Sequence, residues 1–94
     1  MVKVTVNGKT YKCKVADTEE LREEGLQGVE KLEKDEGMLF VFDEEDEVWF
    51  WMKDTKIDLD MVFINEDEEV VKVSTGYADT EDPHEANSVT LTIF

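Results

Sequence analysis

Three aspartates lie close together in the sequence, and their type and spacing come nearest to a catalytic pattern. They are Asp54, Asp58 and Asp60, and Lys53 directly precedes the first of them. If residues 58–60 are extended, the Asp58 and Asp60 side chains share one face and lie about 6.6 Å apart along the strand. Paired carboxylates in hydrolytic enzymes have separations in this range. The same spacing also arises where acids end turns and neutralise a lysine. No histidine or cysteine lies nearby, so we favour the structural interpretation.

The single cysteine and the single histidine offer little nucleophilic or metal chemistry. Cys13 alternates with Lys12 and Lys14, which predicts that it points into the core as a small apolar residue. His84 follows Pro83 in an acidic segment, where a lone histidine is usually exposed to solvent rather than bound to a metal. We therefore expect no catalytic residue of this kind, no metal site and no cofactor.

The segment from Val48 to Lys53 is the most informative strand candidate. Its alternation puts Trp49, Trp51 and Lys53 on one face, opposite an apolar face. Such a strand is either covered on both faces or leaves one aromatic face free for binding. The Lys53 ammonium could lie near an indole ring or pair with a neighbouring aspartate. Both interpretations stay open. If the aromatic face binds a ligand or a partner, Thr55 and Asp60 lie at its rim.

Three apolar runs in the middle of the chain predict its central strands. They cover residues 38–42, 48–52 and 61–64, and each is rich in aromatic and β-branched residues. Five consecutive acids, Asp43 to Glu47, separate the first two runs. Like charges in a row repel and must lie in water, so we interpret this run as the solvated loop of an antiparallel hairpin. A calcium site is the weaker alternative, because the run lacks spaced ligands and a turn-forming glycine.

The two ends of the chain predict further strands. These cover residues 2–6, 10–15, 70–75 and 89–93. Asn7-Gly8 between the first two is the strongest short signal for a hairpin. The run that begins at Val70 predicts a second hairpin with residues 61–64. Residues 76–88 predict one long acidic connection before the last strand.

One short helix is predicted after the first hairpin. Asp17 is suited to cap its N-terminus, with Glu20 three residues later as in a capping box. Gly25 ends the helix, and Leu21 is its main inward residue. Two turns are too short to be stable alone, so the helix must pack on the sheet.

Four spaced motifs resemble one known family. They are Gly25-Leu26-x-Gly28, the run Gly37 to Phe42, the run Phe50 to Thr55, and Leu59-Asp60-x-x-Phe63-Ile64. This pattern closely resembles the domain-of-unknown-function family 192, a group of small bacterial and archaeal domains. The resemblance implies a mainly β fold with one short helix and implies no reaction. The family usually has Asn at Asp54 and Pro at Asp58, whereas Thr55 and Asp60 match its pattern.

The charge balance excludes some classes of partner. The chain has 25 acidic and 10 basic residues and a net charge of −15. Binding to nucleic acid or to anionic lipid is therefore not expected, whereas a basic protein or a small molecule is permitted. The only arginine is Arg22, which argues against a site that recognises phosphate or carboxylate by bidentate forks. The N-terminus alternates like a strand rather than a signal peptide, and a single cysteine fits a reducing compartment, so we expect a cytoplasmic monomer.

Together these features predict a single domain over residues 1–94. Its class is α+β, mainly antiparallel β, with about seven strands in a small open barrel or two-layer sheet and one short helix. The favoured function is a non-enzymatic binding or accessory module that uses the face of Trp49, Trp51 and Lys53. One alternative is a small hydrolase- or lyase-like enzyme that uses Asp60 and Lys53. A further alternative is an acidic protein that docks on a basic partner.

Overall fold

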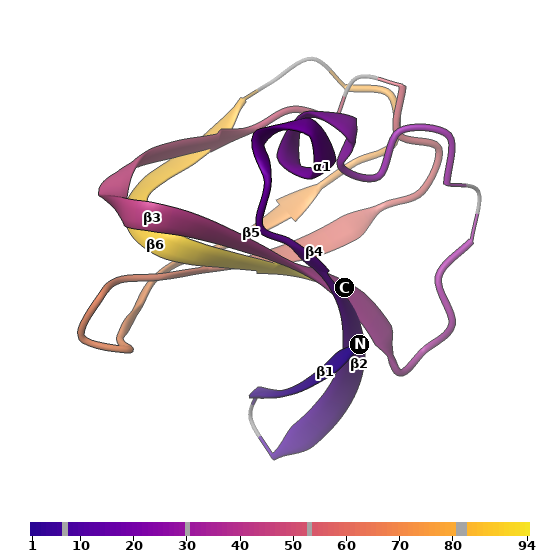
Figure 1. Cartoon of the computed structure of the whole chain (residues 1–94). Coiled ribbons are helices and arrows are strands. Elements are labelled where there is room, and N and C mark those ends of the chain that lie inside the picture. The colour runs from indigo at the N-terminus through magenta and orange to yellow at the C-terminus, as the bar shows by residue number, and fades with distance from the viewer. Residues whose placement is uncertain (7, 30, 53, 81–82) are drawn as a thin grey trace.

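In the part of the chain that the structure describes, six strands form one mixed sheet with a single short helix beside it (Figure 1). The computed structural model describes residues 1–6, 8–29, 31–52, 54–80 and 83–94. The elements are β1 (Val2–Val6), β2 (Lys9–Ala16), α1 (Glu19–Glu24), β3 (Glu36–Phe50), β4 (Leu59–Ile64), β5 (Val70–Gly76) and β6 (His84–Ile93). The strand order is β1-β2-β3-β6-β4-β5, and every neighbouring pair is antiparallel except β2 with β3. Over these described ranges the sheet has two edge strands, β1 and β5, and does not close into a barrel. The predicted fold class is thus confirmed, with six strands in the sheet.

The predicted hairpin around the five acids is wrong, because residues 36–50 form the single strand β3. Both halves of β3 pair with β6, from Met38↔Ile93 to Val41↔Thr90 and from Asp46↔Ser88 to Phe50↔His84. The register shifts between Val41 and Asp46, so extra residues of β3 bulge there. The bulge keeps the acids exposed to water without ending the strand.

The strand β6 makes this pairing possible because it begins at His84, well before the predicted start at residue 89. The predicted long connection of residues 76–88 is therefore also wrong. In Figure 1, β3 and β6 curve back together. Their second paired stretch, residues 46–50 of β3 and 84–88 of β6, therefore lies above the rest of the sheet and forms an outer layer. The Phe40 and Phe50 rings, one from each half of β3, meet edge to face with their centroids 5.7 Å apart.

The core lies between these two layers. It contains mainly large apolar side chains from β3, β4 and β6, with Met52 from just after β3: Phe40, Val48, Phe50, Met52, Leu59, Met61, Phe63, Leu91 and Ile93. Burying each such side chain contributes about 1.5–3 kcal/mol before entropy costs. Cys13 is also buried, as predicted. Gly37 lies where a side chain would not fit, since an added Cβ would come within 2.5 Å of the Ile93 carbonyl oxygen.

The helix begins one residue later than predicted. Thr18, not Asp17, is the N-cap, and its Oγ1 accepts a hydrogen bond from the Leu21 N–H at 3.2 Å. Leu21 is 39% exposed, and none of the six residues of α1 is buried. The prediction that Leu21 points inward is therefore wrong. The predicted end is confirmed, because Gly25 has a positive φ of 50° and its N–H donates to the Leu21 carbonyl.

Both hairpins predicted at the ends of the chain are confirmed. β1 pairs with β2 on either side of a turn that contains Gly8, whose φ is 79°; Asn7 lies outside the described residues. β4 pairs with β5. In the turn between them, Asn65 Oδ1 accepts hydrogen bonds from the Asp67 and Glu69 N–H groups at 3.0 and 2.9 Å.

Candidate functional site

The two faces of the strand end around Trp49 differ sharply in exposure. Val48, Phe50 and Met52 are buried in the core. Trp49 is 48% exposed and Trp51 is 54% exposed. Both tryptophans are thus only partly covered, on the side of the segment opposite the core. Lys53, the third member of that face, lies outside the described residues.

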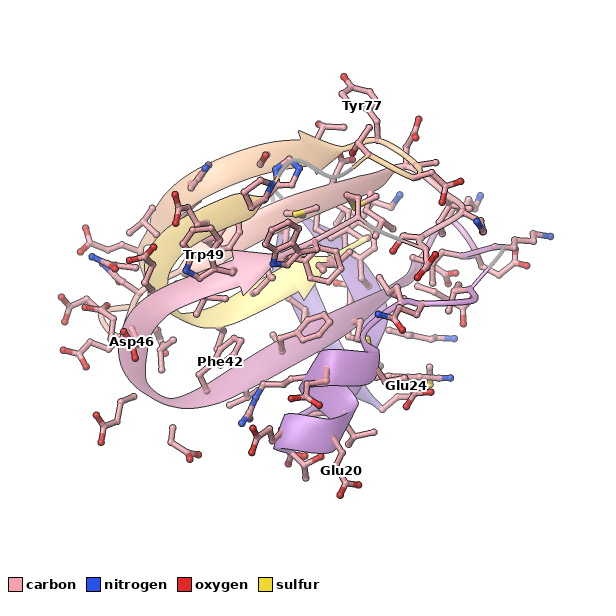
Figure 2. All side chains as sticks on the ribbon, turned by 90° about the horizontal axis from the view of Figure 1, so that it is seen from above. Glu20, Glu24, Phe42, Asp46, Trp49 and Tyr77 are labelled. Carbon is pink, nitrogen blue, oxygen red and sulfur yellow. The ribbon has the colours of Figure 1, made fainter. Side chains whose placement is uncertain are left out.

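A cavity of about 480 Å³ lies beside these tryptophans, between helix α1 and the two halves of β3. Figure 2 shows Phe42 and Trp49 on the two arms of the curved β3, with the helix and its Glu24 close by. We call this cavity the α1–β3 groove. Its apolar wall consists of Leu26, Phe40, Phe42, Trp49, Phe50, Trp51 and Leu91. Its polar lining includes Glu19, Arg22, Glu23, Glu24 and Thr55.

Arg22 holds the helix against the strand at one side of the groove. Its Nη1 donates a hydrogen bond to the Val41 carbonyl oxygen at 2.9 Å, and its guanidinium carbon lies 5.2 Å from the centroid of the Phe42 ring. One donor of the guanidinium is thus used within the chain, while the group has five in total. Sequence reasoning missed this residue. Its contact with β3 depends on where α1 lies against a strand 19 residues further along the chain, so no local pattern pointed to it.

The residues proposed from sequence as a single site divide between two places. Trp49, Trp51 and Thr55 line the α1–β3 groove, and Thr55 is buried. Asp60 lies elsewhere, at a second cavity of about 400 Å³ that is also lined by Asp58.

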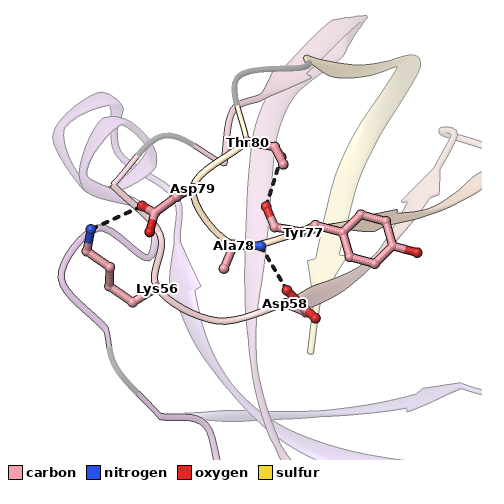
Figure 3. A network of polar contacts seen from close by, with 6 residues as sticks. All are labelled: Lys56, Asp58, Tyr77, Ala78, Asp79 and Thr80. Atoms are coloured by element: carbon pink, nitrogen blue, oxygen red, sulfur yellow. Dashed lines mark hydrogen bonds and ion pairs between the residues drawn. The ribbon is translucent and has the colours of Figure 1, made fainter.

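The aspartates at the second cavity make bonds that hold neighbouring chain segments together. Asp58 Oδ1 accepts a hydrogen bond from the Ala78 N–H at 2.8 Å, in the turn where Lys56 pairs with Asp79 at 3.1 Å (Figure 3). Asp60 Oδ1 accepts from the Thr75 hydroxyl at 3.1 Å. These contacts fit the structural interpretation of the aspartates. Within the described ranges, no three His, Cys, Asp or Glu side chains come together as a metal site would need.

Two carboxyl groups, Glu47 of β3 and Glu85 of β6, lie together on the outer layer. A hydrogen bond with Glu47 raises the pKa of Glu85, and burial and the negative charge of Glu47 act in the same direction, while Lys72 opposes them. Glu85 Oε2 is buried and has no donor partner. Two carboxyl groups can share a hydrogen bond only when one of them is protonated, so this contact favours the protonated state. No local pattern predicts this contact, because the long-range pairing of β3 with β6 brings the two residues together.

The other ionisable groups of note offer no reactive centre. Burial raises the pKa of the Cys13 thiol, which opposes formation of the reactive thiolate. His84 Nδ1 and the Ser74 hydroxyl form a hydrogen bond of 2.5 Å between β6 and β5. This bond joins two strands that are not neighbours in the sheet.

The sequence of the chain places it in a known family. The chain belongs to the family described as "Uncharacterized ACR", domain of unknown function 192, whose sequence model matches residues 2–92. This confirms the resemblance found in the motifs. No curated protein matches the chain significantly. No helix in the described part of the chain is long and apolar enough to cross a membrane.

Two crystal structures share the fold over nearly the whole chain. One is a protein of unknown function from Novosphingobium aromaticivorans, with 26% identity and a TM-score of 0.88; the match covers 97% of this chain and 69% of that one. The other comes from Sinorhizobium meliloti and is described provisionally as a transcription regulator. It has 28% identity and a TM-score of 0.85, and the match covers 97% of this chain and 74% of that one.

Proposed function

We propose that this protein is a binding module and that the α1–β3 groove is its binding site. The observation that carries the proposal is the half-exposed pair Trp49 and Trp51 at the wall of a cavity of about 480 Å³. Ligand sites are typically concave, mostly apolar and about 300–1,000 Å³ in volume, with a few polar groups that fix orientation. Tryptophan and arginine are also the residues that most often dominate binding energy. The groove combines both with an apolar floor.

The alternative of hydrolase or lyase chemistry has less support. It relies on Asp60 acting with Lys53. Asp60 accepts a hydrogen bond from Thr75 and lies at the second cavity, away from the aromatic wall. A general base must reach the substrate proton within hydrogen-bond distance, and a carboxylate at the second cavity does not serve the groove.

The acidic character of the chain restricts what the groove binds. With a net charge of −15, the protein repels nucleic acid and anionic surfaces. We therefore propose neutral or basic ligands or protein partners. A cytoplasmic location belongs to the same proposal, since the one cysteine is free and buried and needs no oxidising compartment.

An NMR fragment titration tests the binding site itself. Uniformly ¹⁵N-labelled protein is titrated with neutral aromatic fragments such as indole, phenol and benzimidazole, and backbone and indole N–H shifts are followed. We expect dose-dependent shifts at residues 22–27 and 40–51, including both tryptophan indoles. The second cavity, near Tyr11 and Phe94, is the internal control. Shifts concentrated there, or no shifts at the groove at millimolar fragment, would overturn the proposal.

A further inference from the structure

One wall of the α1–β3 groove is a free edge of the sheet. Trp49, Phe50 and Trp51 are consecutive, and all three line the cavity. Successive side chains of a strand point to opposite faces. A cavity that touches all three therefore lies along the edge of the strand rather than over one face. β6 pairs with the opposite edge, through Trp49↔Glu85 and Phe50↔His84. Over the described ranges, no second strand pairs with this half of β3.

Two hydrogen bonds indicate which backbone groups of β3 point away from β6. The Glu47 N–H donates to Asp46 Oδ1 of its own strand at 2.7 Å. The carbonyl oxygen of Glu85, the residue opposite Trp49, accepts from Lys72 Nζ of β5 at 3.0 Å and so faces away from β3. In an antiparallel pair, the N–H and C=O of one residue point to the same side, and the side alternates from residue to residue. The N–H and C=O of Trp49 therefore point away from β6, towards the free edge that borders the groove. Those of Val48 and Phe50 point towards β6.

The charges around this edge are predominantly negative. Glu19, Glu23 and Glu24 of the helix line the groove. The run of five acids, residues 43–47, precedes the tryptophans along β3 and is exposed. A partner in this position meets the carboxylates of α1 at the groove, on a chain whose net charge is −15. Lysine or arginine side chains would be attracted there, while acidic ones would be repelled.

We propose that the α1–β3 groove binds an extended polypeptide segment of a partner protein, which adds a strand to the free edge of β3 at Trp49. This inference rests on the proposed binding function and names its partner. Strand addition uses main-chain hydrogen bonds for affinity and alternate side-chain pockets for specificity. One set of side chains of the segment is apolar and enters the cavity over Phe40, Phe42 and Leu91. The other set is basic and meets the glutamates of α1. Strand addition also satisfies the exposed backbone groups of an edge strand.

Amide hydrogen exchange tests the strand pairing directly. The probe is an acetylated and amidated octapeptide in which valine alternates with lysine. We expect exchange at the Trp49 amide to slow about tenfold when the free peptide is at ten times its Kd, because exchange then proceeds from the unbound fraction. The Phe50 amide is the internal control. It points towards β6, opposite His84, so its exchange rate should change far less than that of Trp49.

Two further peptides separate backbone pairing from charge. The same valine–lysine peptide can be N-methylated at alternate residues, along the edge that would pair with β3. It keeps its charge but loses the hydrogen-bond donors of that edge, so we expect it to lose the Trp49 protection. A valine–glutamate peptide tests the charge requirement, and we expect at least about tenfold weaker binding for it at low salt.

The outcomes distinguish this inference from the proposed function. If the valine–lysine peptide shifts the tryptophan indoles without slowing Trp49 exchange, or if the N-methylated peptide protects equally well, strand addition is overturned and a side-chain binding site remains. If neither peptides nor neutral aromatic fragments perturb the groove, both the inference and the proposed function are overturned.

Discussion

The Arg22 guanidinium lies over the Phe42 ring, 5.2 Å from its centroid, and joins helix α1 to strand β3 at the side of the groove. The same side chain donates to the Val41 carbonyl oxygen. A six-residue helix is not stable alone. This contact, together with the burial of Leu26, is what holds the helix in place.

Replacing Arg22 should therefore weaken the protein. We expect Arg22→Ala to lower the free energy of unfolding by about 1–3 kcal/mol, since it removes a charged hydrogen bond and a cation–π contact. Arg22→Lys keeps the charge but not the planar group, so it should recover only part of the loss. Urea unfolding measures both. Glu23→Ala on the same helix is the matched control and should stay within about 0.5 kcal/mol of wild type; equal losses in both variants would contradict the assigned role.

The observed cap predicts different effects for two adjacent residues. Thr18→Ala should destabilise the protein by about 0.5–2 kcal/mol, because it removes the acceptor of the Leu21 N–H. Asp17→Ala should cost less than about 0.5 kcal/mol, because Asp17 makes no capping bond. Thermal or urea unfolding of the two variants decides between the caps. A larger loss in Asp17→Ala would support the cap expected from sequence.

The Glu47–Glu85 pair predicts a pH dependence. The folded-state pKa of Glu85 is raised above its ordinary value of 4.5, so the folded protein holds this proton more tightly than the unfolded chain. Its stabilising contribution is complete below about pH 4.5 and is lost as pH rises through the folded-state pKa. Glu85→Gln is neutral and can donate to Glu47 at any pH. We expect this variant to be more stable than wild type at pH 7, and the advantage to vanish near pH 4.

Urea unfolding at several pH values measures this difference, and the comparison with wild type cancels the titration of the other acids. Glu45→Gln serves as control, since it removes one charge from the neighbouring acidic run. An equal gain in both variants would show that net charge, rather than the carboxyl pair, is responsible.

Gly37 predicts a steric effect on stability. An added Cβ would lie 2.5 Å from the Ile93 carbonyl oxygen, a backbone atom that cannot move without disturbing the pairing of β3 with β6. We expect Gly37→Ala to cost about 1–3 kcal/mol in urea unfolding. The same substitution at Gly76 meets the flexible side chains of Met52 and Met61 and should cost less. The reverse order would mean that the backbone at Gly37 adjusts more easily than the methionines.

Local patterns in the sequence predict the parts of the fold that depend on neighbouring residues. The alternation from Val48 to Met52 correctly separates the buried face from the exposed tryptophans. Asn7-Gly8 predicts the first hairpin, and Gly25 predicts the end of the helix. Each of these signals lies within a few residues of the feature it determines.

The remaining features depend on contacts between distant segments. The acidic run looks like a loop, yet β6 begins early enough to pair with both halves of β3 and keep it one strand. The groove needs the helix, near residue 22, to lie against residues 40–51, and no local pattern predicts that contact. Asp60 matches the motifs around Trp51 in sequence spacing but lies at another cavity. Proximity in sequence was a poor guide to this site.

The measurement that tests the central claim most directly compares peptide binding by Trp51→Ala and Tyr77→Ala. Both variants remove an exposed aromatic ring, but Tyr77 lies outside the residues that line the groove. With the valine–lysine octapeptide in isothermal titration calorimetry, we expect Trp51→Ala to lose about 2 kcal/mol of binding, roughly thirtyfold in Kd, while its urea midpoint stays near wild type. Tyr77→Ala should bind as wild type does. Equal affinity in the two variants would contradict a binding site at the α1–β3 groove.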